Sequence, residues 1–394
     1  MEVVVREYEA ERDLAGAEAV DRMCDVGPSG AVTLFTDLLG DPVCRVRHSP
    51  YFLMLVAETA GPEKEIVGLI RGCVKTVTCD KKTPRSSSSA AAPVYTKAAY
   101  ILGLRVSPNQ RRMGIGLKLV EQMEKWFRSK GVEYAYMATD KDNEASRCLF
   151  IGRCGYSKFR TPSILVQPVF AHCLPISRAV AVVSLTADEA EGLYRGRFCT
   201  TEFFPRDIDA VLRNPLTLGT FVALPAGVHW PGIGRFLADP PESWALLSVW
   251  DSKSLFRLEL RGAPLLWRGL AWTSRAVDRA LPWLRIPSVP NLFRPFGGYF
   301  LYGLGGEGPA AAKLLRALCR HAHNMARAGG CGVVATEVSA GEPLVAGIPH
   351  WKMLSFAEDL WCIKRLAEDY SDGAVGDWTR SPPGGSIFVD PREV

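Results

Sequence analysis

Residues 110–116, QRRMGIG, decide how the first part of the chain is interpreted, because they join an apolar run to a charged amphipathic run. The preceding residues 98–106, AAYILGLRV, are typical of a strand, and Pro108 limits that strand because proline cannot continue the hydrogen-bond ladder. Residues 114–129 repeat apolar side chains every three or four positions, which predicts an amphipathic helix. The segment therefore predicts a short loop between a strand and a helix N-terminus.

The chemistry of this loop favours an anion. A helix N-terminus presents unpaired backbone N–H groups and a partial positive charge. Arg111, Gly114 and Gly116 form the pattern R-x-x-G-x-G, in which glycine lets a phosphate approach the backbone and arginine supplies a charge-assisted partner. The pattern predicts a pyrophosphate cradle, and a tight turn without a ligand is the alternative because short glycine motifs often occur by chance.

The surrounding residues 1–172 alternate strand-like and helix-like patterns in the order β-α-β-β-β-α-β-α-β. The last helix of this region begins near Asn143, a residue that caps helices well. Residues 80–94 contain DKKTPRSSSSAAAP, a polar segment of low complexity that predicts a flexible surface loop. We therefore expect one α/β domain over residues 1–172.

The strand, the arginine–glycine loop, the amphipathic helix and the later Asn-initiated helix, taken in this order, resemble the acetyl-CoA-binding core of the GNAT superfamily of N-acetyltransferases. The resemblance implies an α/β (α+β) fold with a mixed central sheet and acetyl-CoA as co-substrate. It implies that the cofactor contacts are, in chain order, Leu104, Arg105 and Val106 on pantetheine, Arg111, Arg112, Met113, Gly114, Ile115 and Gly116 on pyrophosphate, and then Asn143 and Phe150.

Three further stretches, KDNEAS at 141–146, CGYSKFR at 154–160 and the ending SIFVDPREV at 386–394, resemble the plant Hookless family of probable N-acetyltransferases. This resemblance implies a regulatory role in hormone response and plant development. It also implies a nuclear location, with the cytoplasm as the alternative.

The catalytic residues depart from the superfamily pattern. Many members carry a tyrosine that protonates the departing thiolate, but this chain has Phe150 at that place. Tyr156 is the substitute candidate, and a packing role is its alternative. The general base is not identified, because the carboxylates nearest in sequence are each typical of a solvated charge or a helix cap: Glu133, Asp140, Asp142 and Glu144.

Residues 176–367 repeat the first domain in weakened form. Ala138-Thr139-Asp140 matches Ala335-Thr336-Glu337, and both triplets follow a similar helical run, which predicts a second, degenerate GNAT-like domain. The pattern G-x-G-x-x-G at 303–308 lacks the downstream acid of a nicotinamide site. Its loop has no arginine, and Glu307 would repel a pyrophosphate, so we expect no coenzyme A in this half.

Two segments of the second half are considered separately, and the first of them, residues 262–295, has no counterpart in the first half. Residues 262–295 are apolar, basic and interrupted by prolines, and we expect a helical insertion that packs between the domains or over the cleft. Amphipathic membrane contact is the alternative for this insertion. Residues 368–394 predict a loosely ordered tail, with its last residues docked as an extended strand as a further option.

The composition of the 394 residues sets the remaining expectations. A net charge of +5 is too mild to indicate nucleic acid, and no apolar run reaches the roughly 18 residues of a membrane span. The 11 cysteines include no C-x-x-C pair, so we expect reduced thiols and no metal site. The sequence says nothing about the oligomeric state.

These patterns together predict an acetyl-CoA-dependent N-acetyltransferase that acts on an amine. Protein lysine is the acceptor that the resemblance favours, and a small amine or a protein N-terminus stays open. We expect no sequence-specific nucleic acid binding and no membrane association. A regulatory module that binds coenzyme A and works through partner proteins is the alternative, because neither a general acid nor a general base is evident.

Overall fold

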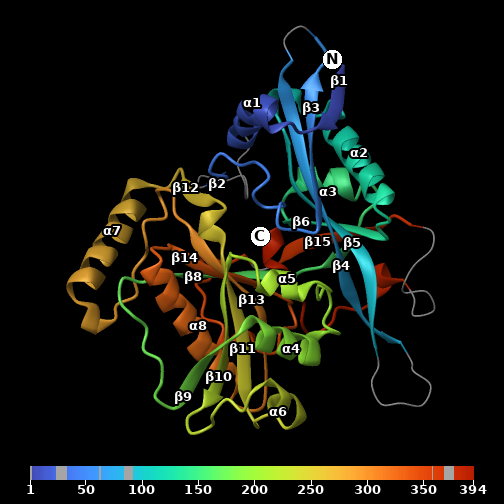
Figure 1. The fold of residues 1–394 in the computed structure, drawn as a ribbon. Helices are drawn as coiled ribbons and strands as arrows, with labels where there is room; N and C mark the ends of the chain where they lie inside the picture. The colour runs from blue at the N-terminus through green and yellow to red at the C-terminus, as the bar shows by residue number, and fades with distance from the viewer. Residues whose placement is uncertain (1, 24–32, 62–63, 84–91, 357, 368–376) are drawn as a thin grey trace. The chain divides into compact units, whose positions relative to one another are not determined.

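The computed structural model describes the whole chain except residues 1, 24–32, 62–63, 84–91, 357 and 368–376 (Figure 1). The chain forms two compact units, each with its own sheet and apolar core. Unit 1 comprises residues 1–161, 358–383 and 393. Unit 2 comprises residues 162–357, 384–392 and 394.

Unit 1 contains a seven-stranded mixed sheet. In sheet order its strands are β1 (Val3–Glu7), β3 (Tyr51–Thr59), β4 (Ile66–Thr83), β5 (Ala92–Val106), β6 (Tyr134–Asp140), β15 (Asp359–Arg365) and β7 (Ser157–Arg160). The neighbours are antiparallel except β5 and β6, which are parallel. A parallel pair needs a crossover connection, and the helix that follows β5 supplies it. Unit 1 also contains the short strand β2 (Thr33–Asp37).

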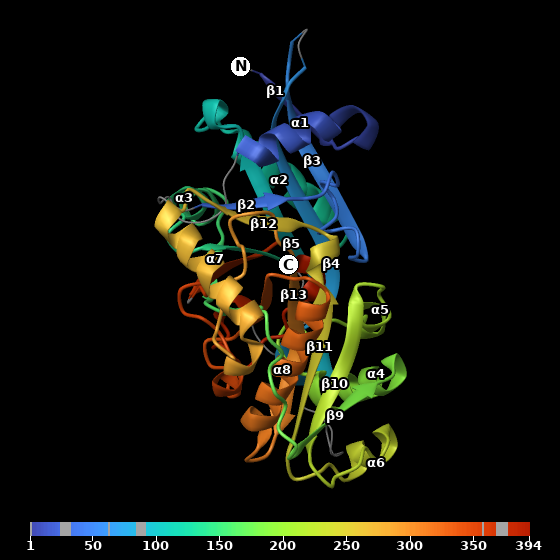
Figure 2. The ribbon, with the colours of Figure 1, turned by 90° about the vertical axis from the view of Figure 1, so that its left-hand side faces the viewer.

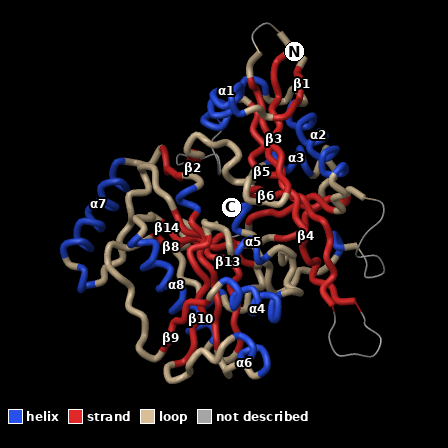
Figure 3. The backbone as a smooth tube through the Cα atoms, viewed as in Figure 1, coloured by secondary structure: helices blue, strands red, loops and turns tan. Residues whose placement is uncertain are grey.

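Helices cover both faces of this sheet (Figure 3). Helix α1 (Ala10–Met23) packs on one face, whereas α2 (Ile115–Ser129) and α3 (Glu144–Phe150) pack on the other. The apolar stripe of α2 is at most 2% exposed and consists of Ile115, Leu119, Met123 and Phe127. Burying each such side chain is worth about 1.5–3 kcal/mol. The helix predicted over 114–129 is therefore confirmed.

Unit 2 contains a six-stranded mixed sheet. In sheet order its strands are β8 (Ser163–Pro168), β14 (Val333–Val338), β13 (Gly298–Glu307), β11 (Trp244–Asp251), β10 (Thr217–Pro225) and β9 (Val180–Leu185). The remaining elements are α4 (Ala187–Phe198), α5 (Ile208–Leu212), α6 (Ile233–Ala238), β12 (Arg257–Arg261), α7 (Leu265–Ala280) and α8 (Ala311–Ala328). Figure 2 shows β10 and β11 between α8 on one side and α4 on the other.

The two units repeat one topology, as the sequence predicted. Each has a single parallel pair formed by two inner strands, β5 with β6 and β13 with β14. Each first strand of the pair contains a bulge at a glycine in the left-handed region, Gly103 at φ 61° and Gly303 at φ 60°. Such a bulge needs glycine because a side chain would be strained there. The second half is a GNAT-like fold.

The unit boundaries differ from the expected 1–172 and 176–367. Strand β8 directly follows the strands of unit 1 in sequence, yet it pairs with β14 of unit 2. Strand β15 follows unit 2 in sequence, yet it pairs with β6 of unit 1. Both strands are short apolar runs, and such a run does not reveal which sheet edge it joins.

The expected tail also differs. Residues 368–376 lie outside the described residues, but Trp378 and residues 388–393 are buried, so the prediction of a loosely ordered tail is wrong for these. The further option of an extended, docked end agrees with the bridge between Ile387 and Glu202. In unit 1, Trp378 is fully buried, with ring centroids 5.4 Å from Tyr134 and 5.7 Å from Phe159. In unit 2, the Phe388 N–H donates to the Glu202 carbonyl at 2.9 Å. Aromatic burial of this kind orders a segment that composition alone makes polar.

The predicted loop at 80–94 is only partly described. Residues 80–83 end β4 and residues 92–94 begin β5, so the prediction of a loop is wrong for them, whereas 84–91 lie outside the described residues. The predicted helical content of the 262–295 insertion is confirmed by α7.

Candidate active site

The candidate site lies where β5 and β6 separate. Their parallel pairing covers residues 98–101 against 134–137 and stops there, although both strands continue. Strand β5 stays paired with β4 up to Val106, and β6 stays paired with β15 up to Asp140. Beyond the last parallel pair, no strand of the described structure pairs with the inner edge of β5. Residues 104–106, predicted to face pantetheine, lie on this stretch.

A buried arginine of β4, Arg71, contacts the bulge in β5. One residue of β4 faces two residues of β5 here, because Arg71 pairs with Leu102 and Leu69 pairs with Arg105. The Arg71 guanidinium donates to the Gly103 carbonyl at 3.4 Å and to Asp21 Oδ2 at 2.6 Å. A Cβ on Gly103 would lie 2.6 Å from Arg71 Nη1. The ion pair with Asp21 thus holds Arg71 against the backbone of the bulge.

The loop after β5 leaves the N-terminus of α2 open. Gly114 caps the helix with φ 80° and makes no side-chain capping bond, and Arg112 is also left-handed at φ 65°. A Cβ on Gly114 would meet no described heavy atom within 4 Å. A Cβ on Gly116 would lie 3.3 Å from Leu149. The space beside the backbone of Gly114, where α2 begins, is therefore open.

The other predicted cradle residues divide into two groups. Arg111, Arg112 and Met113 are exposed, and Arg111 Nε donates to the Val106 carbonyl at 3.4 Å. Ile115 is 2% exposed, and its side chain belongs to the core under α2. Only the backbone N–H of Ile115 is thus suited to a ligand. The arrangement offers cationic side chains and backbone donors, which suits a diphosphate.

Asn143 and Phe150 lie at the two ends of α3. Asn143 Oδ1 accepts the Ser146 N–H at 3.1 Å, so its side chain caps the helix. Phe150 is buried and packs edge to face against Tyr156, with ring centroids 5.2 Å apart. Contact of either residue with the cofactor stays a prediction.

Tyr156 lies in the core rather than at the strand separation. It is 2% exposed, and Lys364 Nζ lies 5.6 Å from its ring centroid. Burial, followed by the charge of Glu124, raises the pKa of Tyr156 well above its ordinary value. A phenol enclosed in this way neither reaches a departing thiolate easily nor gives up its proton readily. This location speaks against the proton-donor role.

Two carboxylates face each other at the end of β6. Asp140 and Asp359 are opposite residues in the antiparallel register of β6 and β15. Burial raises the pKa of Asp359 to about 6, and the charge of Asp140 adds to the shift. Met137 and Leu360 belong to the core under α2, so strand alternation places both aspartates on the opposite face of the sheet.

Sequence reasoning missed Asp359 because nothing local marks it. The residue comes from a strand that follows the whole of unit 2, and only the pairing of β15 with β6 brings it beside Asp140. The other carboxylates considered are less suitable. Glu133 accepts the Lys97 N–H, and Glu144 lies exposed in the first turn of α3.

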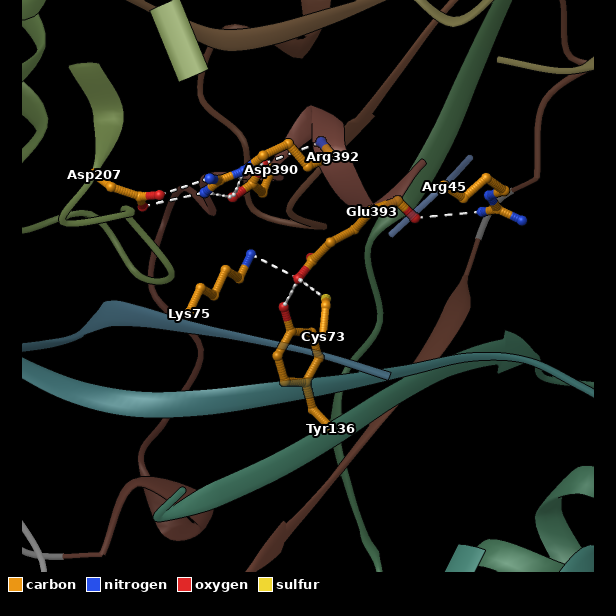
Figure 4. A network of polar contacts seen from close by, with 8 residues as sticks. All are labelled: Arg45, Cys73, Lys75, Tyr136, Asp207, Asp390, Arg392 and Glu393. Carbon is orange, nitrogen blue, oxygen red and sulfur yellow. Dashed lines mark hydrogen bonds and ion pairs between the residues drawn. The ribbon is translucent and has the colours of Figure 1, made fainter. Parts of the chain in front are cut away.

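The same face of unit 1 holds a buried ion pair from the end of the chain (Figure 4). The Glu393 carboxylate accepts the Tyr136 hydroxyl at 2.6 and 2.8 Å, and Lys75 Nζ lies 2.8 Å away. Burial and the charge of Glu393 raise the pKa of Tyr136 well above its ordinary value. Such a satisfied pair is expensive to break. Glu393 is therefore better suited to anchoring the chain than to accepting a proton.

A small pocket adjoins the bulge of β5. It is lined by Asp21, Thr36, Leu38, Arg45, Arg71, Leu102, Gly103 and Arg105. Three arginines against one aspartate give this lining a net positive charge. No group of three or more His, Cys, Asp or Glu within the described part of the chain is placed to hold a metal ion.

In unit 2, other residues of the same unit occupy the space beside the N-terminus of the equivalent helix, α8. A Cβ on Gly308 would lie 1.9 Å from the Glu242 carbonyl oxygen and 2.6 Å from Ser243 Oγ. Ser243 Oγ also accepts the Ala310 N–H at 3.2 Å, just before α8. No arginine stands in this loop, and Glu307 ends β13. The N-terminus of α8 is therefore filled, whereas that of α2 is open.

Comparison with known proteins agrees with this geometry. The profile of the Acetyltransferase (GNAT) family matches residues 27–156. The fold also resembles that of N-myristoyltransferase of Saccharomyces cerevisiae, with a TM-score of 0.52 and 10% identity. The match covers 93% of this chain and 79% of the myristoyltransferase chain. The separated parallel strands, the arginine–glycine loop and the family match define unit 1 as a GNAT acyltransferase domain.

Two relatives match nearly the whole chain. "Probable N-acetyltransferase HLS1" of Arabidopsis thaliana is 63% identical over 400 residues, which cover 99% of each chain. "Acetyl transferase GW6a" of Oryza sativa subsp. japonica is 41% identical over 430 residues, which cover 99% of this chain and 97% of the relative. The chain belongs to this family of GNAT N-acetyltransferases.

Proposed function

We propose that unit 1 binds acetyl-CoA between the separated ends of β5 and β6 and transfers its acetyl group to an amine of a protein. The observation that carries this proposal is the open N-terminus of α2 at Gly114. The first-turn N–H groups, Arg111 and Arg112 would hold the diphosphate, and the backbone of residues 104–106 would hold the pantetheine arm. Acetyl-CoA supplies an activated thioester.

Within this proposal, Asp359 is the general base. An amine at neutral pH is mostly protonated and must lose a proton before its nitrogen can attack the acetyl carbon. A carboxylate with a pKa of about 6 is ionised at pH 7 and still basic enough to accept that proton. Asp140 keeps the site negative and so attracts the ammonium form. The amide N–C bond forms as the C–S bond of the thioester breaks.

The acceptor in this proposal is a lysine whose neighbours are not strongly basic. The pocket at the bulge carries three arginines, which would repel a polybasic tail. A protein N-terminus and a small amine are the alternatives. A direct test is to incubate the protein and labelled acetyl-CoA with lysine peptides that differ only in acidic or basic flanks. Preferential labelling of the acidic-flanked peptides supports the proposal, and preference for basic flanks contradicts it.

A second candidate function is a regulatory module that binds acetyl-CoA without transferring the acetyl group. Phe150 in place of the usual tyrosine and the burial of Tyr156 favour this candidate. Calorimetry with acetyl-CoA and the labelling assay separate the two functions. Binding without labelling of any peptide or amine would select the module.

We include in the proposal a regulatory role in plant hormone response and development, exercised in the nucleus. Its support is the Hookless resemblance and the family membership. Imaging of the fluorescently tagged full chain in plant cells tests the location. Exclusion of the tagged protein from nuclei would contradict this part of the proposal without affecting the enzymatic part.

A further inference from the structure

Helix α7 of unit 2 turns its apolar side to solvent. Its buried residues are Ala271 and Asp278. The exposed fractions are 81% for Leu265, 72% for Leu266, 62% for Leu270 and 74% for Trp272. A surface helix of a globular protein normally has the opposite arrangement, with its apolar stripe against the core. The expectation that this insertion packs between the domains or over the cleft stays a prediction.

Polar contacts within unit 2 fix α7 in this orientation. Asp278 Oδ1 lies 2.6 Å from His172 Nδ1, and Asp278 Oδ2 accepts the Ala171 N–H at 2.7 Å and the Ser288 hydroxyl. Arg275 donates to the Val169 carbonyl. Rotating the helix to bury its leucines would separate these groups from their partners. A buried carboxylate without a hydrogen-bond partner is very unfavourable. The outward apolar face is thus built into the fold.

The apolar face continues past the end of the helix. Trp283 is 69% exposed and Leu284 is 54% exposed in the turn that follows α7. Of the 19 large apolar side chains exposed among the described residues, eight fall within residues 265–286. Single exposed apolar residues are ordinary, but a cluster of this density marks a binding surface.

The exposed charges of the segment that contains this face are of one sign. Residues 260–306 contain six arginines and a single acidic residue, Asp278, which is fully buried. Arg268, Arg279 and Arg285 are exposed on or beside α7. The binding surface therefore combines leucines and tryptophans with cations and presents no exposed carboxylate of this segment.

We propose that α7 binds the surface of an anionic lipid bilayer and lies in its plane. The leucines and Trp272 enter the headgroup–acyl boundary, and the three exposed arginines pair with anionic headgroups. No described helix is long and apolar enough to cross a membrane, so the association is peripheral. This inference replaces the expectation of no membrane association drawn from the sequence.

The observations favour lipid over the other occupants. A second copy of the chain would bring the same arginines together with no exposed acid from this segment to neutralise them. An acidic protein partner would need a groove shaped to α7. A bilayer needs only an apolar face with aromatic side chains and surrounding cations, and residues 265–286 supply all three.

Vesicle flotation with the full chain tests the proposal. We expect binding to vesicles that contain phosphatidylserine, much weaker binding to pure phosphatidylcholine vesicles, and loss of binding at high salt. The double variant Leu266→Glu/Leu270→Glu should bind at least about tenfold more weakly, because two apolar anchors become charged. The control is Met353→Glu, which alters an equally exposed residue of unit 2 outside this surface. It should bind like the wild type.

Absence of binding to phosphatidylserine vesicles would overturn the proposal, and so would binding that the double variant leaves unchanged. Binding of an acidic protein through α7 without any vesicle binding would also overturn it in favour of a protein partner. Circular dichroism and acetyl-CoA titration of each variant verify that both units are folded.

Discussion

Unit 1 and unit 2 share strand order and bulge geometry, but they differ at the N-terminus of one helix. At Gly114 the space beyond the backbone is open, whereas at Gly308 it is filled by the Glu242 carbonyl. The carboxylate pair is also present in unit 1 alone. Asp140 faces Asp359, whereas its counterpart Glu337 faces Ile164. Both units therefore keep the sheet, and a few residues before one helix decide whether a unit can hold an anionic cofactor.

The largest effect should come from Gly114→Asp. The substitution places a side chain at φ 80° and a negative charge where the diphosphate would bind. We expect acetyl-CoA affinity to fall at least about a hundredfold in calorimetry. The matched control is Gly155→Asp, because Gly155 has φ 76° and equally open space in unit 1. An equal loss of affinity in both variants would show that strain alone is responsible.

Asp359→Asn should lower kcat by about a hundredfold or more while leaving acetyl-CoA affinity unchanged. Wild-type activity should fall as the pH drops through about 6, because the base must be ionised. The variant should lose this limb of the profile, whereas Glu358→Gln, at the exposed residue just before β15, should keep it. An unchanged pH profile in Asp359→Asn would assign the base elsewhere.

The same substitution should stabilise the folded protein. Because the pKa of Asp359 is raised from 3.8 to about 6, the folded state binds more protons than the unfolded state between these values, and stability falls as the pH rises through this window. At pH 7 the ionised carboxylate therefore destabilises the folded state, and asparagine removes this destabilisation. We expect a gain of about 1–3 kcal/mol in the free energy of unfolding at pH 7 and little change at pH 3. A loss of stability at pH 7 would contradict the assignment.

The two bulge glycines should respond unequally to alanine. A Cβ on Gly303 would lie 2.3 Å from the hydroxyl of Tyr194, which is buried and bonded to Ser248. A Cβ on Gly103 would meet Arg71 Nη1, at the far end of a long side chain, instead. We expect Gly303→Ala to lower the free energy of unfolding by about 1–3 kcal/mol more than Gly103→Ala. Equal losses in denaturant titrations would mean that left-handed strain dominates at both glycines.

The smallest effect should come from Glu307→Gln. Removing this charge does not clear the Glu242 and Ser243 atoms at the N-terminus of α8, so unit 2 should still bind no acetyl-CoA. Calorimetry should give one cofactor per chain for both the wild type and the variant. A second site in the variant would show that charge, and not space, closes unit 2.

Sequence reasoning succeeded where the chemistry is local. The helix after the QRRMGIG loop and the repeated topology each depend on residues close together in the chain, and both are present in the structure. It failed where distant strands meet. The exchange of β8 and β15 places Asp359 beside Asp140, and no periodicity within either strand marks that pairing.

The orientation of α7 could not be predicted from the sequence for a different reason. Periodicity shows that a helix has an apolar side, but it does not show which side the protein body will hold. Asp278 holds the polar side through His172 and the Ala171 N–H, and these residues lie about a hundred positions earlier in the chain. A buried polar anchor can therefore reverse the usual interpretation of an amphipathic pattern.

The most direct test of the central claim is a crystal structure of the full chain with coenzyme A. The account predicts one molecule per chain, with its diphosphate on the N–H groups of the first turn of α2 beside Arg111 and Gly114. A diphosphate bound at the N-terminus of α8, or an α2 corner that stays empty beside a saturating ligand, would contradict it.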